Sequence, residues 1–144
     1  MAKSPSIFDQ QIGLMIWDVE RHIAREFALR AATLGIAAGL TPFLRVLETR
    51  DGITQQEIAN QARMRGSTTA KALNDLERYR LVTRESSKND GRKNIIWLTR
   101  EGRDLCRRLQ VEAELFNRRL LTGLTQREEK ALRRALAKIR DNLT

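Results

Sequence analysis

The chain has 144 residues, a formal net charge of +9 and a pI near 10.7. This length suits one compact domain, and the apolar fraction of 41% is ordinary for a globular protein. The composition therefore argues against a disordered chain and against two large independent domains. The positive charge favours polyanions as partners, with nucleic acid or an anionic membrane surface as the usual examples.

The apolar segments and the single cysteine predict a cytoplasmic protein. Cys106 is the only cysteine, so no intrachain disulfide can form, which fits a reducing compartment. No basic leader with an apolar run opens the sequence, and no stretch approaches the ~20 apolar residues of a membrane span. One histidine and one cysteine cannot complete a zinc shell, so we expect no metal and no cofactor, and a structural Cys106 rather than a redox sensor.

Charge is distributed unevenly along the chain. Residues 1–53 carry six basic and six acidic side chains, residues 54–100 carry ten and five, and residues 101–144 carry eleven and seven. The middle segment is the most basic for its size. It is therefore the first candidate for contact with an anionic partner.

Apolar spacing and capping residues predict two N-terminal helices. The first helix starts near Ser4–Ser6, ends near Gly35 and Gly39, and carries an apolar stripe at spacings of three and four: Phe8, Ile12, Ile16, Val19, Ile23 and Phe27. Thr41 is expected to cap the second helix, with Pro42 at its first position. That helix should end at Asp51-Gly52 and bury Phe43, Leu44, Val46 and Leu47.

Two further short helices follow with a tight connection. Thr54 and Glu57 have the spacing of a capping box, with Ile58 and Ala59 on the buried face. After a break at 63–66, a fourth helix is expected to bury Ala70, Leu73 and Leu76, while its outer face carries Ser67, Thr68, Lys71, Asn74 and Arg78. Such a pair of helices is typical of a helix-turn-helix.

A hairpin and two more helices complete the predicted elements. Strands at 81–85 and 93–98 flank the polar segment 86–92. Thr99 should cap a fifth helix that is broken at Gly123, with one apolar face formed by Leu105, Leu109, Phe116 and Leu120. Thr125 and Glu128 form a second capping box before a sixth helix that runs to Leu143. The fold class is therefore mainly α, of the α+β winged-helix type.

The order and spacing of these motifs resemble the multiple-antibiotic-resistance-regulator (MarR) family. The resemblance is carried by Gly-Ile-Thr-Gln-Gln-Glu-Ile-Ala (52–59), Ser67-Thr68-Thr69, Leu76-Glu77, Leu81-Val82, Asp90-Gly91-Arg92 and Leu98-Thr99-Arg100-Glu101-Gly102. It implies a single MarR-like domain over 1–144. Within it, residues 41–100 would form a winged helix-turn-helix DNA-binding region, and residues 1–38 and 101–144 a helical dimerisation region.

The sequence departs from the family pattern at two positions. Arg80 stands where glycine commonly follows the recognition helix, so either a left-handed cap is adopted at some strain or the helix ends differently. Lys71 stands where arginine is common, which makes a bidentate guanine contact less favourable and a phosphate contact more favourable. The operator sequence of relatives is therefore not transferable.

The resemblance and the polar residues together predict a DNA interface. Ser67, Thr68, Lys71 and Asn74 would face the major groove, together with Thr69 of the same motif. Arg92 at the hairpin tip would enter the minor groove, with Asp90 matching the acidic residue that orients it in the family. The basic residues placed to neutralise phosphates are Arg63, Arg65, Arg78, Arg84, Lys88 and Lys93. The alternative for each of these residues is an ordinary solvated surface.

The resulting functional hypothesis is a sequence-specific double-stranded DNA-binding transcription regulator, a repressor that acts as a homodimer on a palindromic operator. The resemblance also implies release by a small aromatic or phenolic ligand, for which Trp17, Arg21 and His22 could supply stacking and charge; the alternative is a core tryptophan beside a surface arginine. No nucleophile with a base, paired acid and base, or phosphate-binding glycine loop is visible, so we expect no enzyme. The alternative function is a winged-helix interaction protein that has lost DNA binding and pairs with another regulator.

Overall fold

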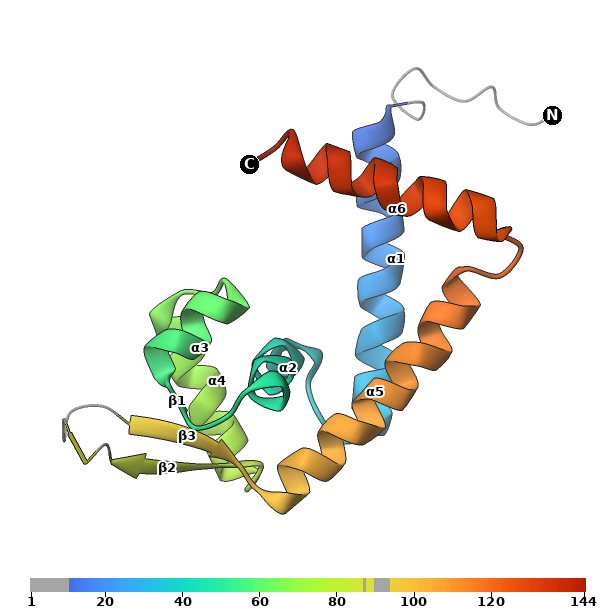
Figure 1. Cartoon of the computed structure of the whole chain (residues 1–144). Coiled ribbons are helices and arrows are strands. Elements are labelled where there is room, and N and C mark those ends of the chain that lie inside the picture. Colours follow the sequence, from blue (N-terminus) through green and yellow to red (C-terminus); the bar gives the residue numbers. More distant parts are fainter. Residues whose placement is uncertain (1–10, 87, 90–93) are drawn as a thin grey trace. The chain divides into compact units, whose positions relative to one another are not determined.

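The computed structural model describes residues 11–86, 88–89 and 94–144 (Figure 1). The chain divides into two compact units, Met1–Gln110 and Val111–Thr144, whose boundary falls inside a helix. The described residues are mostly helical with one small antiparallel sheet, which confirms the predicted winged-helix fold class. The division of the chain into DNA-binding and dimerisation regions stays a prediction.

The first unit begins with the long helix α1, Ile12–Thr33. Gly35 ends it as predicted, with φ of 77°, and the amides of Gly35 and Ile36 donate to the carbonyls of Ala32 and Ala31. The expected start at residues 4–6 and Phe8 lie outside the described residues. The apolar stripe is half-buried at Ile23 and Phe27 but exposed further toward the N-terminus.

A short 3₁₀ helix, η2 (Ala38–Leu40), leads directly into α2, Thr41–Thr49. The expectation that Thr41 caps α2 is wrong: Leu40 occupies the N-cap, and the Thr41 hydroxyl donates to the Ala38 carbonyl at 2.8 Å. The 3₁₀ turn starts helical geometry before Thr41, so its side chain is drawn back to that turn. The predicted buried face is confirmed at Phe43, Leu44, Val46 and Leu47.

Helices α3 (Gln55–Ala62) and α4 (Gly66–Arg78) form the helix-turn-helix. The predicted capping box is present at α3, where the Glu57 amide donates to Thr54 Oγ1 at 3.2 Å and the Thr54 amide donates to Glu57 Oε2 at 2.7 Å. The buried face of α4 consists of Thr69, Ala72, Leu73 and Leu76. Ala70, expected in the core, is only half-buried, because the true buried stripe is displaced toward Thr69 and Ala72.

The sheet has three antiparallel strands in the order β1-β3-β2. Strands β2 (Val82–Ser86) and β3 (Asn94–Leu98) form the predicted hairpin, with Val82 opposite Leu98 and Ser86 opposite Asn94. β1, Ile53–Thr54, pairs with β3 through Ile53 and Ile96 and was not predicted. Figure 1 shows the hairpin beside α4, which packs against β2.

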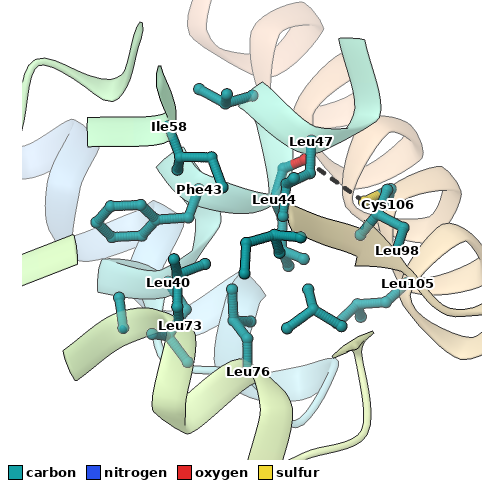
Figure 2. Packing of buried hydrophobic residues seen from close by; sticks show 14 of the residues in the cluster. Leu40, Phe43, Leu44, Leu47, Ile58, Leu73, Leu76, Leu98, Leu105 and Cys106 are labelled. Carbon is teal, nitrogen blue, oxygen red and sulfur yellow. Dashed lines mark hydrogen bonds between the residues drawn. The ribbon is translucent and has the colours of Figure 1, made fainter. Parts of the chain in front are cut away.

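One apolar core joins these elements (Figure 2). Ala31 of α1 is a small buried member, and the larger fully buried side chains come from α2, α3, α4 and the sheet and include Phe43, Leu44, Leu47, Ile53, Ile58, Leu73, Leu76 and Ile96. Cys106 of α5 (Arg100–Leu120) closes one side, and its thiol lies 3.8 Å from the Leu44 carbonyl. Burial, with a smaller effect of Glu48, raises the pKa of the Cys106 thiol to about 11, as expected of a packing residue rather than a reactive thiol.

The first turn of α5 is held to the end of α4. The predicted cap is present, since Thr99 Oγ1 accepts from the Gly102 amide at 3.0 Å, and the same hydroxyl donates to the Arg80 carbonyl at 2.7 Å. The Thr99 amide also donates to the Leu81 carbonyl at 3.0 Å. Gly102 is required at this point, because a Cβ there would lie 2.1 Å from the Leu81 carbonyl oxygen.

Asp51 makes a second attachment of α5. One oxygen of its carboxylate, Oδ2, accepts from the Leu98 amide at 3.1 Å and from the Arg103 guanidinium at 2.6 Å. The Asp51 side chain is 16% exposed, so this ion pair is partly shielded from water. The turn after α2, the end of β3 and the start of α5 are thereby joined through one side chain.

The second unit contains the end of α5, a turn at Gly123 and α6, Gln126–Asp141. Gly123 has φ of 87°, in agreement with the predicted break, and the capping box of Thr125 and Glu128 is present. α6 ends two residues before the predicted Leu143. Leucines 132 and 136 of α6 are more than two-fifths exposed.

No single helix in the described ranges is long and apolar enough to cross a membrane. Only α1 taken together with Ala38–Thr49 passes the criteria of length and composition, and these two segments are bent by 94°.

Candidate nucleic-acid interface

The outer face of α4 carries the largest set of predicted DNA contacts. Because α4 packs through Thr69, Ala72, Leu73 and Leu76, the opposite face is turned to solvent. Ser67, Thr68, Lys71, Asn74 and Arg78 are all exposed there, in the arrangement that the sequence predicts. Hydroxyl, ammonium, amide and guanidinium groups thus follow one another along a helix narrow enough for a major groove.

Thr69 is not part of this surface. Its side chain is 0% exposed, and its hydroxyl donates to the Arg65 carbonyl at 3.0 Å. The expectation that Thr69 contacts DNA is therefore corrected: its methyl group packs in the core, and its only polar atom is satisfied within the helix.

The start of α4 offers backbone amides and two arginines. Arg65 is the N-cap, and no side chain caps this end, in contrast to the capping boxes of α3 and α6. Arg63 has φ of 54° at the end of α3, and both arginines are exposed. The amides and the positive end of the helix dipole are compatible with a phosphate oxygen at this position.

Arg78, in the last turn of α4, is largely solvated. Its guanidinium donates to Asp75 at 2.8 Å and lies 5.6 Å from the centre of the Tyr79 ring, while the side chain is 71% exposed. An exposed ion pair of this kind contributes little to stability. Arg78 can therefore exchange Asp75 for a phosphate at small cost.

Arg84 of β2 is arranged differently. Its Nε donates to Glu77 Oε2 at 3.0 Å, and its terminal nitrogen donates to Asn74 Oδ1. Only 21% of the Arg84 side chain is exposed. Two of the predicted DNA contacts, Asn74 and Arg84, are therefore bound to each other across the α4–β2 packing.

The wing contributes one further described cation. Lys88 is exposed between the hairpin strands. Asp90, Arg92 and Lys93 lie outside the described residues, so the minor-groove role of Arg92 stays a prediction.

The candidate ligand residues lie on α1 and are exposed. The Arg21 guanidinium is 4.9 Å from the centre of the Trp17 ring, and Trp17 is 57% exposed. His22 Nδ1 lies 2.7 Å from the Asp18 carbonyl oxygen. Trp17 and Arg21 thus stack on each other through their side chains, whereas the His22 ring contacts the backbone of α1. Trp17 is not the core residue of the alternative interpretation.

Sequence reasoning missed two residues at this surface. Glu77 anchors Arg84, and Tyr79 places an exposed ring beside Arg78. The spacing of Asn74 and Glu77, three residues apart on α4, could have indicated a shared partner.

No group of three or more potential metal ligands is found within the part of the chain that the structure describes.

Comparison with known sequences identifies the same segment. Residues 41–93 match the sequence model of the MarR family. The HTH-type transcriptional repressor Rv2887 of Mycobacterium tuberculosis is 26% identical over 131 residues, which cover 91% of this chain and 94% of that protein.

Solved structures share the fold over nearly the whole chain. The transcriptional repressor CouR bound to a 23-mer DNA duplex is 24% identical, with a TM-score of 0.84 over 96% of this chain and 99% of CouR. The DNA complex of MepR from Staphylococcus aureus is 22% identical, with a TM-score of 0.83 over 92% of this chain and 98% of MepR. Rv2887 and CouR are named as transcriptional repressors and MepR as a transcription regulator, so none of the three is described as an enzyme. The matched segment covers the helix-turn-helix and the start of the wing, and by this match and by its fold the chain is similar to the MarR family of winged-helix transcription regulators.

Proposed function

We propose that this regulator is a sequence-specific repressor that binds a palindromic operator as a homodimer, with α4 in the major groove and the β2–β3 wing along the adjacent backbone and minor groove. The observation that carries the proposal is the outer face of α4, where Ser67, Thr68, Lys71 and Asn74 are exposed beside a basic hairpin. Similar chains, MepR and CouR, are described as complexes with DNA.

The electrostatic part of the proposal is tested by the salt dependence of binding. Each phosphate neutralised by a lysine or arginine lowers the slope of log K against log salt concentration by about 0.9. Fluorescence anisotropy with a labelled duplex is expected to give a steep negative slope. A flat response would contradict the proposal.

Selection from a random duplex library tests sequence specificity. A twofold dimer presents two recognition helices about 34 Å apart, one turn of B-DNA. The selected duplexes are expected to contain inverted half-sites whose centres are about ten base pairs apart. Failure to retain any duplex would favour the interaction protein that has lost DNA binding.

Exposed apolar side chains support the homodimer. On α1, Ile12, Met15, Ile16 and Val19 recur at spacings of three and four, and each is at least 36% exposed. The second unit exposes a further set: Val111, Leu115, Leu120, Leu124, Leu132, Leu136 and Leu143. A second copy of the chain would cover such surfaces, in a helical dimerisation region formed by residues 1–38 and 101–144.

Sedimentation at micromolar concentration is expected to give twice the chain mass of 16.6 kDa. Ile16→Glu places a charge within the α1 stripe and should shift the mass toward one chain. Asp18→Ala, an exposed change on the same helix, is the matched control and should leave the dimer intact. A wild-type protein of single-chain mass would overturn the homodimer.

An aromatic acid or phenol is the proposed effector, bound beside the stacked Trp17 and Arg21. Such a ligand would shift the population toward a form with weaker DNA affinity. Calorimetry with a panel of aromatic carboxylates and phenols is expected to show binding that Trp17→Ala abolishes. Absence of binding, with unchanged DNA affinity, would remove the effector from the proposal.

A further inference from the structure

The hydrogen bonds around Arg84 fix the orientation of one residue on the recognition helix. Arg84 reaches from β2 to α4, where it donates to Glu77 Oε2 at 3.0 Å and to Asn74 Oδ1. Arginine has five donors and no acceptor, so the atom of the Asn74 amide that faces Arg84 must be the oxygen. The Asn74 amide therefore lies with its oxygen toward Arg84 and its NH₂ group away from Arg84.

The other end of that amide is left for a partner. Asn74 is exposed, and its NH₂ group makes no hydrogen bond within the described ranges of the chain. Asparagine reads adenine by accepting from N6 with its oxygen and donating to N7 with its NH₂ group. Because the oxygen is turned toward Arg84 and one of its two lone pairs is engaged there, the donor half of this pattern is the half that the protein leaves without a partner.

We propose that Glu77 and Arg84 are positioning residues that present Asn74 to the major groove as a hydrogen-bond donor. This inference rests on the proposed function. The base-pair edge that Asn74 reads is then one with an acceptor: N7 of a purine, O6 of guanine or O4 of thymine. The N4 amino group of cytosine is disfavoured, and the bidentate adenine contact is weakened because its acceptor half is shared with Arg84.

The same geometry assigns Arg84 a role other than phosphate contact. Two of its donor groups are used within the protein, and its side chain is 21% exposed against 71% for Arg78. A residue that contacts a phosphate contributes to the salt slope but not to base preference. A residue that positions Asn74 affects base preference but not the salt slope. The two roles are therefore separated by two measurements on the same variant.

The test uses the full-length chain, the duplex obtained by random selection and all single base-pair variants of that duplex. Asn74→Ala is expected to lose about five- to tenfold of base preference at one position in each half-site, the size of one hydrogen bond. Arg84→Met keeps much of the side-chain length but removes every donor. It should change the preference at that same position toward adenine, because the Asn74 oxygen is released, while the salt slope stays at the wild-type value.

Arg78→Met is the matched control, since Arg78 is an arginine at the same surface with a solvated guanidinium. It is expected to make the salt slope shallower by about one for each protomer and to leave all base preferences unchanged. The proposal is overturned if Arg84→Met makes the salt slope shallower and leaves all base preferences unchanged, as Arg78→Met is expected to do. It is also overturned if Arg84→Met leaves the base preference unchanged at the position that Asn74→Ala affects. An Asn74→Ala protein with unchanged preference at every position overturns it as well.

Glu77→Ala provides a second test if Arg84→Met does not fold. Removal of an acidic side chain should, by charge alone, tighten binding to all duplexes equally. If Glu77 holds Arg84 in place, the preference at the Asn74 position falls instead, and an unchanged preference there overturns the proposal. If the wild-type chain binds no duplex at all, the proposed function and this inference are both overturned. The outcomes named for the Asn74, Glu77 and Arg84 variants reject the inference alone.

Discussion

Replacing Arg80 by glycine is expected to stabilise the protein. Arg80 follows α4 with φ of 58°, in the left-handed region that side chains with a Cβ disfavour. The conformation is imposed by two hydrogen bonds, from the Arg80 amide to the Glu77 carbonyl and from the Leu81 amide to the Leu76 carbonyl, both 2.9 Å. They form a Schellman motif, whose left-handed residue is usually glycine.

The magnitude follows from two opposing terms. A residue with a Cβ in the left-handed region is destabilised by about 1–2 kcal/mol, and Arg80→Gly removes that strain. Glycine loses more backbone freedom on folding, at a cost of about 0.5–1 kcal/mol. The expected net gain is about 0.5–1 kcal/mol, because the Arg80 side chain is exposed and little packing is lost.

Urea denaturation measures this gain as a higher midpoint at an unchanged m-value. Arg80→Ala is the control, since it removes the charge and the long side chain but keeps the Cβ. Arg80→Gly should be more stable than Arg80→Ala by about 1 kcal/mol. Equal midpoints for the two variants would refute the argument from backbone strain.

Three other variants or modifications test further parts of the structure. Cys106, with its raised pKa of about 11, should resist iodoacetamide at pH 8 in the native protein and react after unfolding, as followed by mass spectrometry. Gly52→Ala should lower the unfolding free energy by about 2 kcal/mol in a denaturation series, because φ is 70° and the added Cβ would lie 2.5 Å from the Trp97 ring. Hydrogen bonds from the Thr125 amide and hydroxyl lower the pKa of Glu128, so this carboxylate stabilises the fold at neutral pH and the contribution is lost as pH falls below its ordinary value of 4.5. Thr125→Ala should therefore lose less Tm than the wild type between about pH 6 and pH 3.

The features that the sequence predicts well are those set by a few neighbouring residues. The capping boxes at Thr54 and Thr125 are complete within four residues each, and both are present. At Arg80 the sequence leaves two alternatives, a strained left-handed cap or a different helix end, because arginine replaces the glycine that usually marks this turn. The structure adopts the strained form.

Features that depend on other parts of the fold were harder to predict. Thr69 is a predicted DNA contact because it belongs to the motif Ser67-Thr68-Thr69, but its hydroxyl is satisfied by its own helix and its side chain is buried. β1 has two residues, too few for a periodic pattern. The bond between Asn74 and Arg84 joins residues ten positions apart on a helix and a strand, so the spacing of Asn74 and Glu77 can indicate a shared partner but does not identify it as Arg84.

The attachments of Thr99, Gly102 and Arg103 have a mechanical consequence for α5. Its first turn is bonded to the backbone of Leu81 and to the Asp51 carboxylate, which ties it to the end of α4 and to the sheet at several points. A signal that travels along α5 cannot be absorbed by a swivel at its origin. A displacement of that first turn would be transmitted through these bonds to the end of α4 and to the sheet.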